Sequence, residues 1–283
     1  MASLRLRISI LAFCTCLVIQ CSCYGHSVLQ KKHAALFIFG DSVYDPGNNN
    51  YINTTTDFQA NWFPYGETFF KYPTGRFCDG RLIPDFLAQY AKLPFIPAYL
   101  QPGLNNYSNG VNFASGGAGA LVESHQGFEI YKKGGRKFGF STLPPLNEIP
   151  SLRVHKPGDT SPSAEEVIPL VKLHNKALGK LLLKLKRELE GFKYSTIDLH
   201  TYLKQIINRP SKYGFSEGKT ACCGSGPYRA INSCGGKRGV TKYQLCDNVA
   251  EYVFFDSFHP TEKVYRKLSK LWWKHNLKEL FEV

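Results

Sequence analysis

Apolar residues form a short continuous run at 35–39 that ends at Gly40. A run of this length that stops at a glycine predicts a strand buried on both faces. Two further apolar stretches, 137–143 and 195–199, predict a second and a third strand. The segment 251–255 is predicted as a further strand near the end of the chain, and a loop follows it.

Three segments repeat their apolar residues with a helical period, at 82–93, 167–189 and 261–273. Strands and helices therefore alternate along the chain, which predicts an α/β fold with a parallel sheet. The intervening segment 45–80 is rich in Gly, Pro, Asn and aromatic residues, which indicates long loops with short helical pieces. Residues 111–119 form a glycine-rich loop.

The start of the longest predicted helix presents a conflict. Ser163 and Glu166 have the spacing of a capping box, in which each side chain accepts a backbone N–H of the other residue. Pro169 would then lie inside the first turns of the helix. A proline is well tolerated at the first helical position, so we expect the helix to begin at Pro169.

The first 24 residues have the organisation of a cleaved secretory signal. Arg5 and Arg7 precede an apolar stretch at 8–19, and small residues follow it. A membrane anchor is the alternative, but the stretch is shorter than the roughly 20 residues of a spanning helix. We therefore expect a signal peptide at 1–24, a secreted protein, and a single domain at 25–283. No later segment of the sequence is long and apolar enough to span a membrane.

The composition is that of a folded protein, with 43% hydrophobic and 20% charged residues in 283. The formal net charge is +13, and about +11 remains once the two arginines of the signal are removed. Nucleic-acid binding is not expected of a secreted protein, so anionic wall or membrane surfaces are the better non-specific partners. The lysines of the long helix recur along one side, as on a solvated face: Lys172, Lys176, Lys180 and Lys184.

Five of the nine cysteines lie beyond the signal, at Cys78, Cys222, Cys223, Cys234 and Cys246. The secretory route favours disulfides, which we expect within 222–246, and the odd number leaves one thiol over. The cysteine spacing fits no zinc site, so we expect no metal. Two sequons, at Asn53 and Asn106, are candidate glycosylation sites.

Ser42 follows the first predicted strand directly, after Gly40 and Asp41. Ligands bind beyond the carboxyl ends of strands in open α/β sheets, so a hydroxyl at this point would face a cleft. If a helix begins after Ser42, its N–H groups can stabilise an oxyanion. The alternative is that Ser42 is only a helix cap.

Asp256 and His259 lie three residues apart, before the last predicted helix. A serine hydroxyl becomes a good nucleophile only when a nearby base accepts its proton. A histidine can act as that base near neutral pH, and a carboxylate orients its ring. The alternative is a loop histidine that caps the next helix.

Taken together, these segments resemble the plant branch of the GDSL esterase/lipase family, a group of SGNH-type serine hydrolases. The resemblance extends over nearly the whole chain beyond the signal. Its motifs are Phe-Gly-Asp-Ser at 39–42, Asp-Pro-Gly-Asn-Asn-Asn-Tyr at 45–51, Pro-Thr-Gly-Arg-Phe-Cys-Asp-Gly-Arg at 73–81, Gly-Val-Asn-Phe-Ala-Ser-Gly-Gly-Ala-Gly at 110–119, Ala-Cys-Cys-Gly-Ser-Gly at 221–226 and Asp-Ser-Phe-His-Pro at 256–260.

The resemblance implies a three-layer fold, with a parallel sheet flanked by helices, and hydrolysis of small-molecule or lipid esters. It implies Ser42 as nucleophile, His259 as base and Asp256 as the group that orients it. The backbone N–H groups of Ser42 and Gly116 would stabilise the oxyanion. A tight turn is the alternative role of the loop that contains Gly116. The family implies a monomer without metal or organic cofactor.

One block of the family pattern is missing. Members carry Gly-x-Asn-Asp on a central strand, where the Asn is a third oxyanion donor, and no such block occurs here. Segments 120–127 and 129–139, which the family holds far apart, are adjacent. We expect an internal deletion with its seam near 127–130, and a sheet that lacks one central strand. Glu148 stands where relatives usually carry a cysteine.

The missing block has two consequences. Loss of one oxyanion donor typically lowers turnover by about 100- to 1000-fold. Loss of a central strand leaves its neighbours to pair again or to bury unsatisfied backbone groups. A catalytically impaired family member that acts as a binding or complex-associated protein is therefore the alternative function.

Overall fold

The structure is a computed structural model, which describes residues 34–119, 127–154, 163–231, 234–235 and 242–282. Residues 35–283 form one unit of the chain, separate from 1–34, and the features below belong to it. The predicted signal peptide, and the domain boundary that follows it, lie outside the described residues.

Parallel strands occur as two pairs, and an antiparallel pair lies beside them. The pairs are β1 (Lys137–Ser141) with β2 (Lys193–Ile197), β3 (Glu217–Ala221) with β6 (Tyr252–Phe254), and antiparallel β4 (Cys223–Gly224) with β5 (Gln244–Leu245). The three sequence segments predicted as strands at 137–143, 195–199 and 251–255 thus contain β1, most of β2 and β6. Parallel strands alternating with helices confirm the α/β class.

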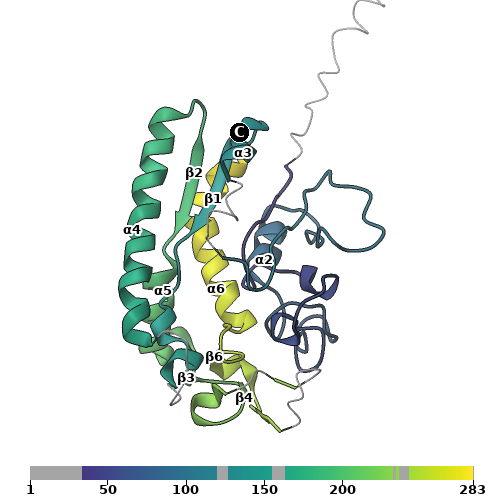
Figure 1. The fold of residues 1–283 in the computed structure, drawn as a ribbon, viewed down its shortest axis with the longest axis vertical. Helices are drawn as coiled ribbons and strands as arrows, with labels where there is room; N and C mark the ends of the chain where they lie inside the picture. The colour runs from purple at the N-terminus through teal and green to yellow at the C-terminus, as the bar shows by residue number, and fades with distance from the viewer. Residues whose placement is uncertain (1–33, 120–126, 155–162, 232–233, 236–241, 283) are drawn as a thin grey trace, which may run out of the picture. The chain divides into compact units, whose positions relative to one another are not determined.

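Helices separate these strands along the chain. They are α2 (Ile83–Tyr90), α3 (Gly127–Lys132), α4 (Ala164–Glu188), α5 (Leu199–Asn208), α6 (Glu262–Trp272) and α7 (Lys278–Phe281), with a π-helical turn at Trp273–Leu277. In Figure 1 the β1–β2 pair runs between α4 on one side and α6 on the other. A hydrogen bond of 2.8 Å from Trp272 Nε1 to Ser195 Oγ joins α6 to β2.

The predicted start of α4 at Pro169 is wrong, because the helix begins at Ala164. Ser163 is the N-cap: its Oγ accepts the Glu166 N–H, and the Glu166 carboxylate accepts the Ser163 N–H at 2.7 Å. The capping box therefore outweighs the single backbone hydrogen bond that Pro169 cannot make to Glu165.

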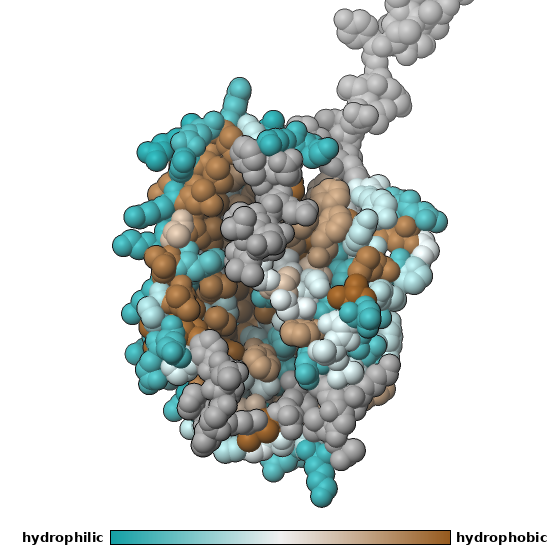
Figure 2. All heavy atoms as spheres, in the orientation of Figure 1, coloured by the Kyte–Doolittle hydropathy of each residue, from teal (hydrophilic) through white to brown (hydrophobic). Residues whose placement is uncertain are grey.

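Helix α4 buries few of its apolar residues. Val167, Val171 and Leu182 are buried, whereas four leucines are exposed: Leu170, Leu173, Leu181 and Leu183. Figure 2 shows hydrophobic surface over the side of the molecule on which α4 lies. The four lysines predicted on a solvated face are all exposed, which confirms that prediction.

The first predicted strand is extended but is not buried on both faces. Ile38 is buried and forms a parallel bridge to Asn112, which also bridges to Ala98. Phe37 and Phe39 are 52% and 48% exposed. The prediction of double burial is therefore wrong: among the described residues, the face that carries Ile38 is covered, whereas the face that carries Phe37 and Phe39 stays about half open to solvent. The backbone of the segment pairs with 109–115.

No backbone ladder joins the 35–39 segment to β1 within the part of the chain that the structure describes. Two groups of parallel segments thus remain separate, one around Ile38 and one at β1–β2. A sheet that lacks a central strand between them agrees with this arrangement.

The largest core cluster lies between α2, α5 and α6. It includes Phe86 and Leu87 of α2, Leu203 and Ile207 of α5, and Val264, Leu268 and Trp272 of α6. Burial of these side chains holds α6 and α2 in place. The loop between β6 and α6 and the loop that leads into α2 are thereby anchored at one end. No helix among the described residues is long and apolar enough to cross a membrane.

Two disulfides lie within 222–246, as predicted. Cys222 bonds to Cys246, Cys223 bonds to Cys234, and Cys78 is a buried free thiol. The consecutive cysteines thus have different partners: Cys222, just before β4, is linked to the residue after β5, and Cys223, in β4, is linked to the segment between β4 and β5.

Candidate active site

Ser42 follows the extended 35–39 segment in a tight turn. The Tyr44 N–H donates to the Asp41 carbonyl at 3.1 Å, and the Val43 N–H donates to Asp41 Oδ1 at 3.0 Å. No helix begins directly after Ser42, because residues 42–44 form only this turn, so the condition for helix N–H groups at an oxyanion is not fulfilled there. Asp41 therefore caps the turn that presents the Ser42 hydroxyl.

The loop after β6 positions Asp256 and His259 through its own backbone. Asp256 Oδ1 accepts the N–H groups of Phe258 at 2.9 Å and His259 at 2.7 Å. The Phe255 N–H closes the loop by donating to the His259 carbonyl at 2.8 Å. These contacts fold the four residues 256–259 back on themselves, so that the carboxylate and the imidazole meet.

The structure brings the three predicted catalytic residues together. The Ser42 Oγ lies 2.8 Å from His259 Nε2, and His259 Nδ1 lies 2.8 Å from Asp256 Oδ1 and 3.0 Å from Oδ2. An ionised carboxylate can only accept hydrogen bonds, so the proton of this contact lies on Nδ1. Nε2 is then the acceptor for the Ser42 hydroxyl, which is the arrangement of a serine–histidine–aspartate triad.

The Asp256 carboxylate is fully buried yet ionised. Burial raises its pKa, but attraction to His259 and hydrogen bonds from His259, Tyr65 and the Phe258 N–H lower it more strongly, to about 2. Asp256 therefore carries a negative charge at neutral pH, beside the ring that receives the proton of Ser42.

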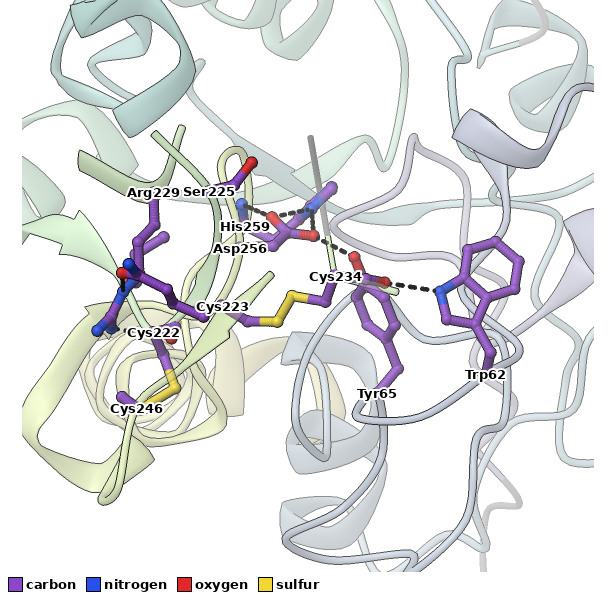
Figure 3. Close-up of a disulfide and its surroundings, with 12 residues drawn as sticks. Trp62, Tyr65, Cys222, Cys223, Ser225, Arg229, Cys234, Cys246, Asp256 and His259 are labelled. Carbon is purple, nitrogen blue, oxygen red and sulfur yellow. Dashed lines mark hydrogen bonds and ion pairs between the residues drawn. A yellow bond between two sulfur atoms is a disulfide. The ribbon is translucent and has the colours of Figure 1, made fainter. Parts of the chain in front are cut away.

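A tyrosine that the sequence interpretation missed donates to the same carboxylate. The Tyr65 hydroxyl lies 2.7 Å from Asp256 Oδ2, and the whole tyrosine is buried (Figure 3). Tyr65 lies 191 residues before Asp256 in the sequence. No local pattern around position 65 indicates this contact, because it depends on how two distant segments pack.

The predicted oxyanion donor Gly116 has another partner. Its N–H donates to Asp45 Oδ2 at 3.0 Å, while Asp45 Oδ1 accepts the N–H groups of Gly47 at 2.8 Å and Asn48 at 2.6 Å. The Gly116 N–H thus already donates to a buried carboxylate, and its role as an oxyanion donor stays a prediction. The Ser42 N–H has no hydrogen-bond partner among the described residues.

Two of the three asparagines after Asp45, Asn48 and Asn49, join this loop to the glycine-rich loop. Asn48 Nδ2 donates to the carbonyls of Asn112 and Ala114, both at 2.8 Å. Asn49 Nδ2 donates to the Gly116 carbonyl at 2.8 Å, and Asn49 Oδ1 accepts the Ser115 hydroxyl at 2.6 Å. The Asp-Pro-Gly-Asn-Asn-Asn motif therefore fixes the loop beside the site rather than contributing reactive groups.

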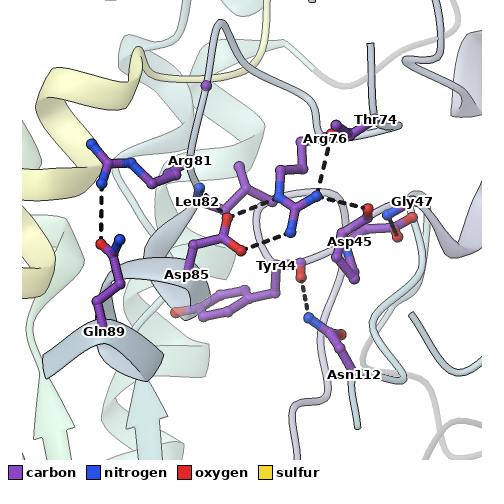
Figure 4. A network of polar contacts seen from close by, with 12 residues as sticks. Tyr44, Asp45, Gly47, Thr74, Arg76, Arg81, Leu82, Asp85, Gln89 and Asn112 are labelled. Carbon is purple, nitrogen blue, oxygen red and sulfur yellow. Dashed lines mark hydrogen bonds and ion pairs between the residues drawn. The ribbon is translucent and has the colours of Figure 1, made fainter. Parts of the chain in front are cut away.

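A buried ion pair holds the same loop from the other side. Arg76 bonds to both oxygens of Asp85, at 2.8 Å from Nε and 2.7 Å from Nη2, and its Nη1 donates to the Pro46 carbonyl (Figure 4). Asp85 Oδ2 also accepts the Leu82 N–H at the start of α2. The ion pair thus connects α2 to the loop that contains Asp45.

Comparison with known proteins agrees with this geometry. The family model described as GDSL-like lipase/acylhydrolase matches residues 36–132 and 120–272. The chain belongs to this family. A GDSL lipase of Tanacetum cinerariifolium is 39% identical to this chain, in an alignment that covers 99% of this chain and 96% of the relative. GDSL esterase/lipase 2 of Arabidopsis thaliana is also 39% identical, over 94% of each chain.

The aligned region is longer than this GDSL family member itself. The alignment with the Tanacetum lipase extends over 359 residues, whereas the chain has 283, so the relative carries residues without a counterpart here. The family model also matches in two parts, which overlap at 120–132. Membership of the family supports an esterase/lipase-type hydrolase.

The two predicted glycosylation sites of this family member lie on the surface. Asn53 and Asn106 are both exposed. No group of three or more His, Cys, Asp or Glu side chains that could hold a metal ion occurs among the residues that the structure describes.

Proposed function

We propose that the protein hydrolyses carboxylic esters through a triad of Ser42, His259 and Asp256. The contact of 2.8 Å between Ser42 Oγ and His259 Nε2 carries this proposal. It joins a hydroxyl and a base that are 217 residues apart in the sequence, in a chain whose family consists of lipases and acylhydrolases.

The reaction follows from the positions of these groups. Ser42 Oγ attacks the ester carbonyl carbon while its proton passes to His259 Nε2, and Asp256 stabilises the resulting imidazolium. The tetrahedral intermediate collapses, and the departing alkoxide takes the proton from Nε2 and leaves as an alcohol. Water, activated by the same base, then attacks the acyl-enzyme and releases the acid.

The oxyanion of the intermediate needs backbone donors. We assign the Ser42 N–H to this role. The Gly116 N–H is the second proposed donor, and it would share its hydrogen between Asp45 and the oxyanion. The family's Asn donor is absent from the sequence.

Exposed aromatic rings close to the triad residues in the sequence support an apolar ester as substrate. Phe39 precedes Ser42 by three residues and stacks on Phe113, with ring centroids 5.1 Å apart. Phe258, next to His259, is 53% exposed. A small-molecule or lipid ester with an apolar acyl group would cover such rings.

The setting of the enzyme is also a proposal. The signal-like first 24 residues and two disulfides support a secreted protein. Exposed sequons at Asn53 and Asn106 support glycosylation, and the net positive charge supports contact with anionic wall or membrane surfaces. The proposed active form is a monomer without nucleic-acid partner or cofactor.

A fluorophosphonate probe tests the catalytic assignment. The probe should label wild-type protein on Ser42, as found by mass spectrometry of the labelled peptide, and should not label Ser42→Ala. Ser211→Ala, at an exposed serine of the Pro210–Tyr213 turn, is the matched control and should label like wild type. Equal labelling of Ser42→Ala and wild type would contradict the assignment.

The missing Asn donor supports a second candidate, a family member with impaired catalysis that acts as a binding or complex-associated protein. We propose that an internal deletion near 127–130 removed the donor and a central strand; the two-part family match and the longer relatives support it. Sequencing the transcript across codons 120–135 tests the deletion. Turnover of short-chain esters in the range of active esterases would contradict the impaired function.

A further inference from the structure

We propose that Tyr65 is a positioning residue of the catalytic triad, which fixes the Asp256 carboxylate in the orientation that receives His259. This inference rests on the proposed function, because it assigns a role within the same site.

The two oxygens of Asp256 have separate sets of donors. The backbone N–H groups of Phe258 and His259 both donate to Oδ1, whereas Tyr65 donates to Oδ2 at 2.7 Å. His259 Nδ1 lies between the two oxygens, at 2.8 and 3.0 Å. With donors on both oxygens, the carboxylate cannot rotate without breaking a hydrogen bond in a fully buried site.

The ring of Tyr65 is itself held by three aromatic side chains. It packs edge-to-face on Phe255, with centroids 5.3 Å apart, and makes similar contacts to Trp62 and Phe77, at 6.3 and 6.5 Å. Phe77 also packs on the imidazole of His259, at 5.0 Å. The hydroxyl of Tyr65 is therefore directed at Asp256 by packing, before any substrate is bound.

Trp62 connects this packing to a disulfide. Its Nε1 donates to the Cys234 carbonyl at 2.9 Å, and Cys234 is bonded to Cys223, the first residue of β4 (Figure 3). Trp62, Tyr65, Phe77 and Phe255 thus belong to one buried cluster together with Cys223 and Cys234.

A neutral donor suits this position chemically. A phenol stabilises a buried carboxylate by a hydrogen bond but leaves its negative charge in place. That charge is needed to stabilise the imidazolium form of His259 during the reaction. A cation at the same position would neutralise the carboxylate and oppose proton transfer to His259.

Tyr65→Phe removes only the hydroxyl and keeps the ring contacts, so it tests the hydrogen bond. The chain offers a matched control in Tyr265→Phe. Tyr265 is equally buried, on α6, and its hydroxyl has no hydrogen-bond partner among the described residues. Both variants therefore lose one buried phenolic oxygen, but only one of them loses a contact to Asp256.

For Tyr65→Phe we expect kcat for a short-chain p-nitrophenyl ester to fall about 10-fold, equal to about 1.4 kcal/mol of transition-state stabilisation. KM should change by no more than about 2-fold, since Tyr65 lies behind the carboxylate and not against the ester. The acid limb of the kcat/KM profile should move to higher pH, because an Asp256 without its phenolic donor holds the proton on His259 more strongly. Tyr265→Phe should keep the wild-type kcat and profile.

A proton NMR measurement judges the contact without turnover. The low-field resonance of the His259 Nδ1–H, identified by its loss in His259→Gln, should move further downfield in Tyr65→Phe and stay in place in Tyr265→Phe. Unchanged kinetics together with an unchanged resonance in Tyr65→Phe would overturn the role of Tyr65. If the wild-type protein shows neither labelling nor turnover, the proposed hydrolase function is contradicted. A downfield shift of the His259 Nδ1–H resonance in Tyr65→Phe relative to wild type would still support the positioning contact in that case.

Discussion

Asp256 and His259 are joined twice: His259 Nδ1 lies 2.8 Å from Asp256 Oδ1, and the same oxygen accepts the backbone N–H of His259 at 2.7 Å. One carboxylate thus fixes both the backbone and the ring of the same histidine. This relationship makes the tautomer of His259 depend on Asp256 being ionised.

Asp256→Asn should keep the fold of the loop and lower kcat by about 10⁴-fold, because an amide can place a donor against Nδ1 and favour the wrong tautomer. The measurement is kcat on a short-chain ester, with Asp247→Asn, at an exposed position, as control. A loss of less than tenfold would show that His259 keeps its tautomer without the carboxylate.

Asp79 should make stability depend on pH. Burial raises its pKa to about 6, although hydrogen bonds from the Glu262 N–H and Thr68 oppose the shift. The unfolded value is about 3.9, so between about pH 4 and 6 the folded state binds more protons, and stability falls as pH rises through this range. Above pH 6 both states have lost the proton and this contribution is constant.

Asp79→Asn should abolish that fall, which amounts to roughly 3 kcal/mol for a shift of about two pH units. Its amide can still accept from the Glu262 N–H, which donates to Oδ1 at 2.8 Å in the wild type. Urea unfolding at several pH values measures the effect. A slope in Asp79→Asn equal to that of wild type would assign the pH dependence to another group.

Arg76→Met should destabilise the protein by about 3–5 kcal/mol, since it leaves the Asp85 carboxylate buried without its partner. The exposed pair Lys184–Glu188 provides a control, and Lys184→Met should leave the free energy of unfolding nearly unchanged. Denaturant unfolding measures both. Equal stability of Arg76→Met and wild type would show that Asp85 is stabilised by other donors.

Removal of the Cys222–Cys246 bond should lower the free energy of unfolding by roughly 3–4 kcal/mol, because the bond closes a loop whose ends are 24 residues apart. The variant Cys222→Ser/Cys246→Ser tests this, with peptide mapping of wild type to identify the linked cysteines. A Cys222–Cys234 peptide in wild type would contradict the connectivity.

Regular patterns along the chain allowed several elements to be predicted. The helical period at 82–93 and 261–273 marks α2 and α6, whose apolar faces pack on each other in the core. Ser42, Asp256 and His259 were found because each lies in a short motif next to a strand. The structure brings these three together, and their catalytic roles remain proposed.

Features that depend on distant segments were not predictable. Phe37 and Phe39 would be buried only if another part of the chain covered the face on which they lie, and their own apolar character does not show whether it does. The N–H of Gly116 is engaged by a carboxylate 71 residues earlier. Tyr65 is one of 16 tyrosines in the sequence, and only its packing distinguishes it.

The distance along the chain between Ser42 and His259 also has a consequence for biosynthesis. A ribosome must add all but the last 24 residues of the 283 before the hydroxyl can meet its base. An incomplete product that stops before His259 would carry the proposed nucleophile without its proposed base. Under the proposed mechanism, the growing chain would thus lack hydrolytic activity until synthesis is nearly finished.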